Sequence, residues 1–328
     1  MSKLRAGVIG VGYLGAFHAE KYQRIPGVKL VGLADTNFSR AKEISNRYNV
    51  EAHKEYKTLL PKVDILSIVV PSGMHYEVAK DCLARGIHCL VEKPLTENVN
   101  EANELVALAK DKQIVLQVGH LERFNPVIKK VSHLLKSPYK IKTRRFSRHQ
   151  SRGTDTDVIL DLMIHDLDIV LSLANSEVID VQATGSTVIT DFIDIANAMV
   201  FFKDGLVAEL GASRVSTEIV RDVEVCCKSG KYVLNFLTHE AKFFESGEVS
   251  DQTGQSIRVL ETGKTDVDAL YDELVAFVES IQYGGSPVVS GEDGKRALEL
   301  AVEISSKIKS SSSQFPKSSV FLKKNDQH

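Results

Sequence analysis

The stretch Gly10-Val11-Gly12-Tyr13-Leu14-Gly15 decides the fold, because it joins an apolar strand expected at Ala6–Ile9 to a helix expected at Leu14–Arg24. A G-x-G-x-x-G motif in this strand–turn–helix setting is typical of dinucleotide-binding domains. Gly10 permits the tight turn, Gly12 lets a pyrophosphate approach the backbone, and Gly15 lets the helix pack closely on the strand. The helix start at Tyr13 and Leu14 offers N–H groups and the positive end of the helix dipole to the phosphates. The alternative is a glycine-rich turn that binds no ligand.

Asp35 indicates which dinucleotide is bound. It ends the next expected strand, Val28–Ala34, about 20 residues beyond the last glycine. A carboxylate there accepts hydrogen bonds from the ribose hydroxyls and repels a 2′-phosphate, which favours NAD over NADP. Arg40 follows closely and is either a cofactor contact, able to meet a 2′-phosphate, or a solvated charge on a helix. We therefore expect NAD as the cofactor, with Asp35 and Arg40 at its adenosine end.

Strand and helix patterns alternate from the first residues to Val118. Further strands are expected at Val28–Ala34, Ile65–Val70, His88–Val91 and Val115–Val118, and helices at Asn37–Tyr48, Val78–Ala84 and Val99–Lys110. Such alternation produces a parallel sheet with helices on both faces. The sequence therefore predicts an α/β protein whose first domain, residues 1–122, is a doubly wound Rossmann domain with a sheet of about five parallel strands.

The pattern changes in the second half of the chain. After a helix at Pro126–Leu135, strands are expected at Lys140–His149, Val178–Val188, Ile193–Phe202, Leu206–Ser213, Asp222–Lys228 and Lys231–Phe236. They alternate polar and apolar residues and follow one another through short turns, which predicts a mostly antiparallel sheet. Helices are expected at Ile159–Leu173, Val267–Tyr283 and Asp293–Lys309. We expect an α+β domain over residues 123–310 and a loosely ordered, serine-rich tail over 311–328.

Bulk composition excludes several classes of protein. The formal net charge is −2 in 328 residues, which gives no reason to expect a nucleic-acid or membrane partner. The four cysteines have neither zinc-ligand spacing nor the density of a secreted disulfide framework, so we expect reduced thiols and no metal site. The chain has no signal-peptide core and no apolar stretch of about 18 residues. A cytoplasmic protein with a small-molecule partner is the expectation.

Several motifs resemble one family of sugar dehydrogenases. They are Val69-Val70-Pro71-Ser72-Gly73-Met74-His75, Gly86 to Leu95 with Glu92-Lys93-Pro94, His120 to Pro126, Asp161-Leu162-Met163-Ile164-His165, and Ser290 to Gly294. The family is that of glucose-fructose oxidoreductase and inositol dehydrogenase, and within it the chain is most similar to UDP-N-acetylglucosamine 3-dehydrogenases. The resemblance implies a second domain built on a large open sheet. One face of that sheet covers the nicotinamide, and the other commonly forms the interface of a homodimer or homotetramer.

Lys93, Asp161 and His165 are the catalytic group that the resemblance implies. Lys93 ends a buried strand directly before Pro94, and the carboxyl ends of parallel strands border the ligand crevice. Asp161 and His165 lie four residues apart on one expected helix face, which Asp168 continues, whereas Asp166 points elsewhere. Oxidation of an alcohol needs a base and a group that polarises the oxygen. We favour His165 as the base and Lys93 as the polarising group, although the two roles are open to exchange.

The same resemblance implies further binding residues. His75 is expected beside the nicotinamide or its ribose, with a loop histidine as the alternative, and Glu92 at the nicotinamide ribose. Pro71 and Lys93 are expected among the cofactor contacts, and Arg123 and Asn125 are expected to contact cofactor or substrate. His120 differs from the aromatic residue often found at this place in the family, which argues against transferring the substrate of its free-sugar members.

A UDP-sugar substrate requires cations for its diphosphate. Arginines cluster at two places, namely Arg144, Arg145, Arg148 and Arg152, and Arg214 and Arg221. Of these, Arg148 and Arg214 are the candidates for substrate binding, and solvated strand arginines or a short nucleic-acid patch are the alternatives.

The leading functional hypothesis is NAD-dependent oxidation of UDP-N-acetylglucosamine at C3. A separate aminotransferase would convert the 3-keto product into a 3-amino sugar for lipid A. The alternatives are an inositol or free-sugar dehydrogenase, and a non-catalytic sensor that binds NAD.

Overall fold

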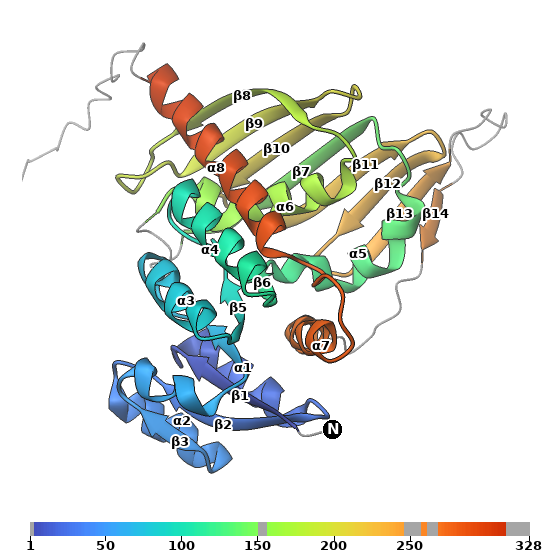
Figure 1. Cartoon of the computed structure of the whole chain (residues 1–328). Coiled ribbons are helices and arrows are strands. Elements are labelled where there is room, and N and C mark those ends of the chain that lie inside the picture. The colour runs from blue at the N-terminus through green and yellow to red at the C-terminus, as the bar shows by residue number, and fades with distance from the viewer. Residues whose placement is uncertain (1–2, 150–155, 246–256, 261–267, 313–328) are drawn as a thin grey trace, which may run out of the picture.

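Two sheets, each with its own helices, make up the protein. The computed structural model describes residues 3–149, 156–245, 257–260 and 268–312. Figure 1 shows the N-terminal sheet below and the larger second sheet above it, with α8 running along the second sheet. This arrangement confirms the predicted fold class, an α/β protein with a Rossmann domain followed by an α+β part on a large open sheet.

The first sheet has six strands in the order β3-β2-β1-β4-β5-β6, and all neighbouring strands are parallel. Its strands are β1 (Leu4–Ile9), β2 (Val28–Ala34), β3 (Glu51–His53), β4 (Ile65–Ile68), β5 (His88–Glu92) and β6 (Leu116–Gly119). The helices are α1 (Tyr13–Arg24), α2 (Phe38–Tyr48), α3 (His75–Ala84) and α4 (Val99–Asp111). This strand order is that of the dinucleotide-binding fold. The short edge strand β3 is the addition to the predicted set, because three residues are too few to show a period.

The second sheet has eight strands in the order β14-β13-β12-β11-β7-β10-β9-β8. They are β7 (Lys140–Phe146), β8 (Val178–Ser186), β9 (Ile195–Phe202), β10 (Val207–Ser213), β11 (Val220–Cys227), β12 (Gly230–Asn235), β13 (Glu240–Glu245) and β14 (Ile257–Leu260). Strands β7 and β10 pair in parallel and the other neighbours are antiparallel, as the alternating sequence predicted. Helix α5 (Pro126–Val131) leads from the first sheet into the second.

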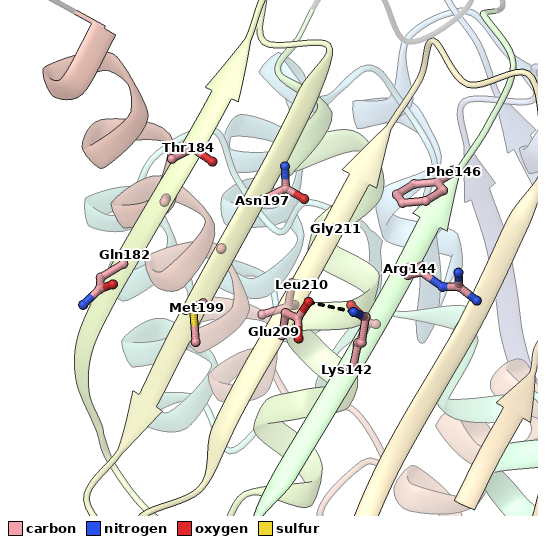
Figure 2. Close-up of a pocket in the computed structure, with 13 residues that line it drawn as sticks. Lys142, Arg144, Phe146, Gln182, Thr184, Asn197, Met199, Glu209, Leu210 and Gly211 are labelled. Carbon is pink, nitrogen blue, oxygen red and sulfur yellow. Dashed lines mark hydrogen bonds and ion pairs between the residues drawn. The ribbon is translucent and has the colours of Figure 1, made fainter. Parts of the chain in front are cut away.

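Helices cover one face of the second sheet. The predicted helix at Ile159–Leu173 is a π-helical turn, Ile159–Met163, followed by α6 (Ile164–Leu173). The apolar residues of α6 and α8 (Gly291–Ser312) pack on the alternate inward residues of the strands, such as Ile141 and Val225. No described helix covers the opposite face. A hollow of about 470 Å³ lies there. Figure 2 shows residues that line it, among them Lys142, Phe146 and Met199.

The C-terminal helices connect the two sheets. Helix α7 (Ala269–Gln282) buries Leu274 and Phe277 in the core of the first sheet, beside α1. The Val118 N–H of β6 donates to the carbonyl of Val289, just before α8 begins. Residues late in the sequence therefore complete the core of the N-terminal sheet.

Some predicted features lie outside the described residues. Arg152 and residues 313–328 are among them, whereas Ser311 and Ser312 end α8. Among the helices that the structure describes, none is long and apolar enough to cross a bilayer.

Candidate active site

The glycine turn has two glycines that the fold requires and one that faces open space. Gly10 has a φ of +84°, and a Cβ added to it would lie 2.3 Å from the carbonyl oxygen of Val69. A Cβ on Gly15 would lie 1.9 Å from the carbonyl oxygen of Gly10. A Cβ on Gly12 would meet no described atom within 4 Å. The space beside Gly12, at the start of α1, is where a pyrophosphate would approach the backbone, so the turn fits a dinucleotide.

Asp35 and Arg40 hold the other side of this turn. Asp35 accepts the N–H groups of Val11 and Asn37, each at 2.8 Å, so its carboxylate is fixed beside the turn. Arg40 donates from Nε to the carbonyl of Val11 at 3.0 Å and pairs with Glu43 at 2.8 Å. The structure therefore places both predicted adenosine-end residues at the glycine turn, and their contacts with NAD stay predictions.

Lys93 and Asp161 meet where the two sheets join. The Lys93 Nζ donates to the main-chain carbonyl of Asp161 at 2.7 Å and lies 3.5 Å from its carboxylate. Both side chains are partly exposed, at 20% and 28%. Lys93 follows β5 of the first sheet, and Asp161 lies in the π-helical turn over the second sheet. The ammonium group retains donors for a substrate oxygen, because the Asp161 carbonyl takes only one.

His165 lies beside this pair as a neutral imidazole. Burial, reinforced by the positive charge of Lys93, holds the pKa of His165 well below its usual value. Its Nδ1 is buried without a hydrogen-bond partner among the described residues, while the residue as a whole is partly exposed. The ring of His120 lies edge-on to it with the centroids 6.3 Å apart. A neutral imidazole accepts a proton, so His165 is suited to the predicted role of base.

Glu92 begins a chain of hydrogen bonds within the first domain. His18 lies between Glu92 and Ser67, with its Nε2 3.2 Å from the Glu92 carboxylate and its Nδ1 3.0 Å from the Ser67 hydroxyl. Burial opposes ionisation of Glu92, but His18 and Lys93 together keep the Glu92 pKa below its usual value. A Cβ on Gly119 would lie 2.9 Å from the Glu92 carboxyl atoms, so glycine at this position leaves room for the carboxylate.

His75 contacts the main chain on either side of the site, next to Lys93. Its Nδ1 is 2.7 Å from the carbonyl oxygen of Pro94, and its Nε2 is 2.9 Å from that of Val70. His75 is buried, whereas Pro71 is exposed at the start of the same connection. The imidazole therefore ties the end of β4 to the end of β5, and its predicted contact with the nicotinamide stays a prediction.

Two buried ion pairs attach α6 to its neighbours. Arg123 binds the carboxylate of Asp168 through two nitrogens at 2.7 and 3.0 Å. Arg145 of β7 binds Asp166 at 2.8 Å and Glu122 at 2.8 Å. Asp168 does not continue the face of Asp161 and His165 as an available carboxylate, because it is buried against Arg123.

The three other predicted substrate residues have contacts within the protein. The Asn125 side chain caps α5 and donates to Glu122 and to the carbonyl of Phe236. Arg148 is exposed and donates to the carbonyl of Thr217 at 3.2 Å. Arg214 is 4% exposed, donates to the carbonyl of Thr156 at 2.6 Å and lies 3.7 Å from the Asp194 carboxylate. Their roles toward a substrate stay predictions.

Sequence reasoning did not assign His18 or Glu122 to this centre, and it named Arg145 only as part of an arginine cluster. A signal for Arg145 was present, since it has the same strand parity as the buried Ile141 and Thr143 and therefore faces the helices. His18 had none, because its partners are separated from it by about 50 and 75 residues in the chain.

The chain matches known proteins along most of its length. Residues 4–120 match a family model described as oxidoreductase family, NAD-binding Rossmann fold, and residues 130–233 match the GFO/IDH/MocA C-terminal domain. A UDP-N-acetylglucosamine 3-dehydrogenase from Acidithiobacillus ferrooxidans is 35% identical over 93% of this chain and 97% of that protein. A solved structure of the Acidithiobacillus enzyme is 34% identical, with a TM-score of 0.88 over 94% of this chain and 99% of that one. A myo-inositol 2-dehydrogenase from Thermotoga maritima is 27% identical over 90% of this chain and 94% of that protein.

The glycine turn, the two-sheet architecture and these matches define a NAD-dependent dehydrogenase. The chain belongs to the glucose-fructose oxidoreductase, inositol dehydrogenase and MocA family, as the sequence motifs indicated. When bound, NAD⁺ supplies the hydride acceptor for oxidation of an alcohol.

Proposed function

We propose that this dehydrogenase oxidises the C3 hydroxyl of UDP-N-acetylglucosamine to a ketone. The observation that carries the chemistry is the grouping of Lys93 and Asp161, 3.5 Å apart, with His165, whose burial keeps it neutral. The similarity to the Acidithiobacillus enzyme over 93% of this chain supports the choice of substrate.

Lys93, Asp161 and His165 each have a separate role in the oxidation of the alcohol. Lys93 donates a hydrogen bond to the C3 oxygen, and Asp161 fixes the ammonium group through its carbonyl and carboxylate. His165 takes the hydroxyl proton as the C3–H bond breaks and its electron pair leaves with the hydrogen. The C3–O bond becomes a carbonyl, and the net products are the 3-keto sugar, one proton on His165 and the reduced cofactor.

Incubation of the protein with NAD and the nucleotide sugar tests this function. An aminotransferase and its amino donor are added, because conversion of the 3-keto product draws the reaction forward. Mass spectrometry should then detect a UDP-linked 3-amino sugar. Absence of that product, with an active aminotransferase confirmed separately, contradicts the proposed substrate.

A second candidate is an inositol or free-sugar dehydrogenase. The 27% identity to an inositol 2-dehydrogenase over 90% of this chain favours it as the alternative. Comparison of NAD reduction with myo-inositol, free N-acetylglucosamine and UDP-N-acetylglucosamine at matched concentrations separates the two activities.

The proposed setting follows from the same substrate. We place the enzyme in the cytoplasm, upstream of an aminotransferase that makes the 3-amino sugar for lipid A. We also propose a homodimer or homotetramer that uses the open face of the second sheet, where Met199 is 40% exposed beside the hollow of Figure 2. Light scattering on the purified protein measures the number of subunits.

A further inference from the structure

Arg221 lies on the same side of the second sheet as the candidate active site. It is the second residue of β11, whose Val223 and Val225 point inward and are buried under the helices. Alternate residues of a strand share a face, so Arg221 shares theirs. Unlike them it is exposed, which puts it at the edge of the helical cover. Figure 1 shows β11 next to β7 in the centre of the sheet.

The register places Arg221 beside the residues that surround His165. Arg221 is directly opposite Arg145 of β7 in the antiparallel pair. Opposed residues in such a pair have neighbouring side chains on one face. Arg145 binds Asp166 at 2.8 Å, and Asp166 adjoins His165 in α6. The charge of Arg221 also contributes to lowering the pKa of His165, after burial and the larger effects of Lys93, Arg145 and His120.

Charge balance distinguishes Arg221 from the other cations of the centre. Lys93 has Asp161, Arg123 has Asp168, and Arg145 has Asp166 and Glu122. These four carboxylates are therefore already paired with cations of the protein. Within residues 3–149, 156–245, 257–260 and 268–312, the Arg221 side chain has no hydrogen-bond or ion-pair partner. An exposed guanidinium beside neutralised pairs is available for an anion from solution.

Other arginines nearby are held differently. Arg144 projects from the opposite face, as Figure 2 shows, and binds both oxygens of Asp222. Arg214 is buried against Asp194. Of these described arginines, Arg221 is the one that is exposed on the helix-covered face and lies opposite Arg145.

We propose that Arg221 binds the diphosphate of a nucleotide-sugar substrate and so selects it over the free sugar. This proposal rests on the proposed function, because it assumes that the substrate carries a diphosphate beyond the reacting ring. The planar guanidinium binds two phosphate oxygens at once, which a lysine ammonium does not reproduce.

Kinetics of Arg221→Ala, with Arg221→Lys and Lys228→Ala beside it, tests the proposal. Lys228 is an exposed cation directly after the other end of the same strand. For Arg221→Ala, the KM for UDP-N-acetylglucosamine should rise about tenfold to a hundredfold, since a charged hydrogen-bonded contact is lost. Arg221→Lys should recover part of the loss, and Lys228→Ala should behave as the wild type. An unchanged KM in Arg221→Ala overturns the proposal.

A binding measurement keeps this test separate from the test of the function. Calorimetric titration of UDP into NAD-saturated protein reports the diphosphate site without turnover. If the wild type binds UDP and Arg221→Ala binds it about tenfold more weakly or worse, the site stands even if UDP-N-acetylglucosamine is not oxidised. If the wild type binds no UDP, or both proteins bind it equally, the site is disproved.

Discussion

The Nζ of Lys93 donates a 2.7 Å hydrogen bond to the main-chain carbonyl of Asp161, joining the end of β5 to the π-helical turn over the second sheet. The acceptor is backbone, so the position of the ammonium group depends on the path of the turn as well as on the Asp161 side chain. The contact couples the cofactor domain to the sheet that faces it.

Lys93→Ala should therefore abolish turnover and spare NAD binding. Loss of the group that polarises the substrate oxygen should lower kcat by about 10²- to 10⁴-fold. The glycine turn, which lies elsewhere on the first sheet, keeps its geometry. Stopped-flow measurement of NAD reduction and a fluorescence titration with NADH provide the two readouts. Lys110→Ala, an exposed lysine of α4, is the matched control. Biological activity that survives Lys93→Ala would favour the NAD-binding sensor instead.

Gly12→Ala and Gly15→Ala should fail in different ways. The new Cβ at position 12 meets no described atom within 4 Å, so the fold should keep its melting temperature while the affinity for NAD falls about tenfold or more. At position 15 the Cβ would lie 1.9 Å from the carbonyl oxygen of Gly10, so the protein should lose about 1–3 kcal/mol of stability. Thermal unfolding with and without NAD separates the two effects. Equal loss of stability in both variants would contradict the interpretation of Gly12.

The sequence predicted those parts of the structure that a few consecutive residues determine. Short motifs determine three of them: the glycine turn, the strand that ends at Lys93 and the polar–apolar alternation of β7. The pairs Arg123–Asp168 and Arg145–Asp166 depend on how α6 docks between the sheets, and their members are 45 and 21 residues apart. The π-helical turn also escaped prediction, because the apolar spacing of Ile159–Leu173 suits a regular helix.

Glu273 should make the folded protein less stable as the pH rises. It is fully buried in α7 with both carboxyl oxygens unpartnered among the described residues, and burial, aided by the charge of Glu92, raises its pKa well above the usual 4.5. The folded protein then keeps a proton that the unfolded chain loses, so this group lowers the free energy of unfolding as the pH rises above 4.5, by at most about 1.4 kcal/mol per pH unit. The variant Glu273→Gln has no carboxyl proton to lose.

The stability of this variant relative to the wild type should therefore increase with pH, as urea unfolding between about pH 5 and 8 would show. The exposed Glu279→Gln in the same helix is the control, and a difference that stays constant with pH would disprove the neutral carboxyl.

The fall of kcat/KM at low pH should follow the protonation of His165. A base must be unprotonated, and burial together with Lys93 holds the His165 pKa well below its usual value of 6.5. A depressed pKa means that more acid is needed to protonate the imidazole, so kcat/KM should stay level as the pH falls to 6.5 and decline below it. His165→Asn, which has no titratable ring, should lose about 10²- to 10⁴-fold in kcat and lack this acid limb. Initial rates of NAD reduction in buffers of constant ionic strength measure both profiles. A limb centred at or above 6.5 would contradict the buried, neutral imidazole, and a full rate in His165→Asn would transfer the role of base to Lys93.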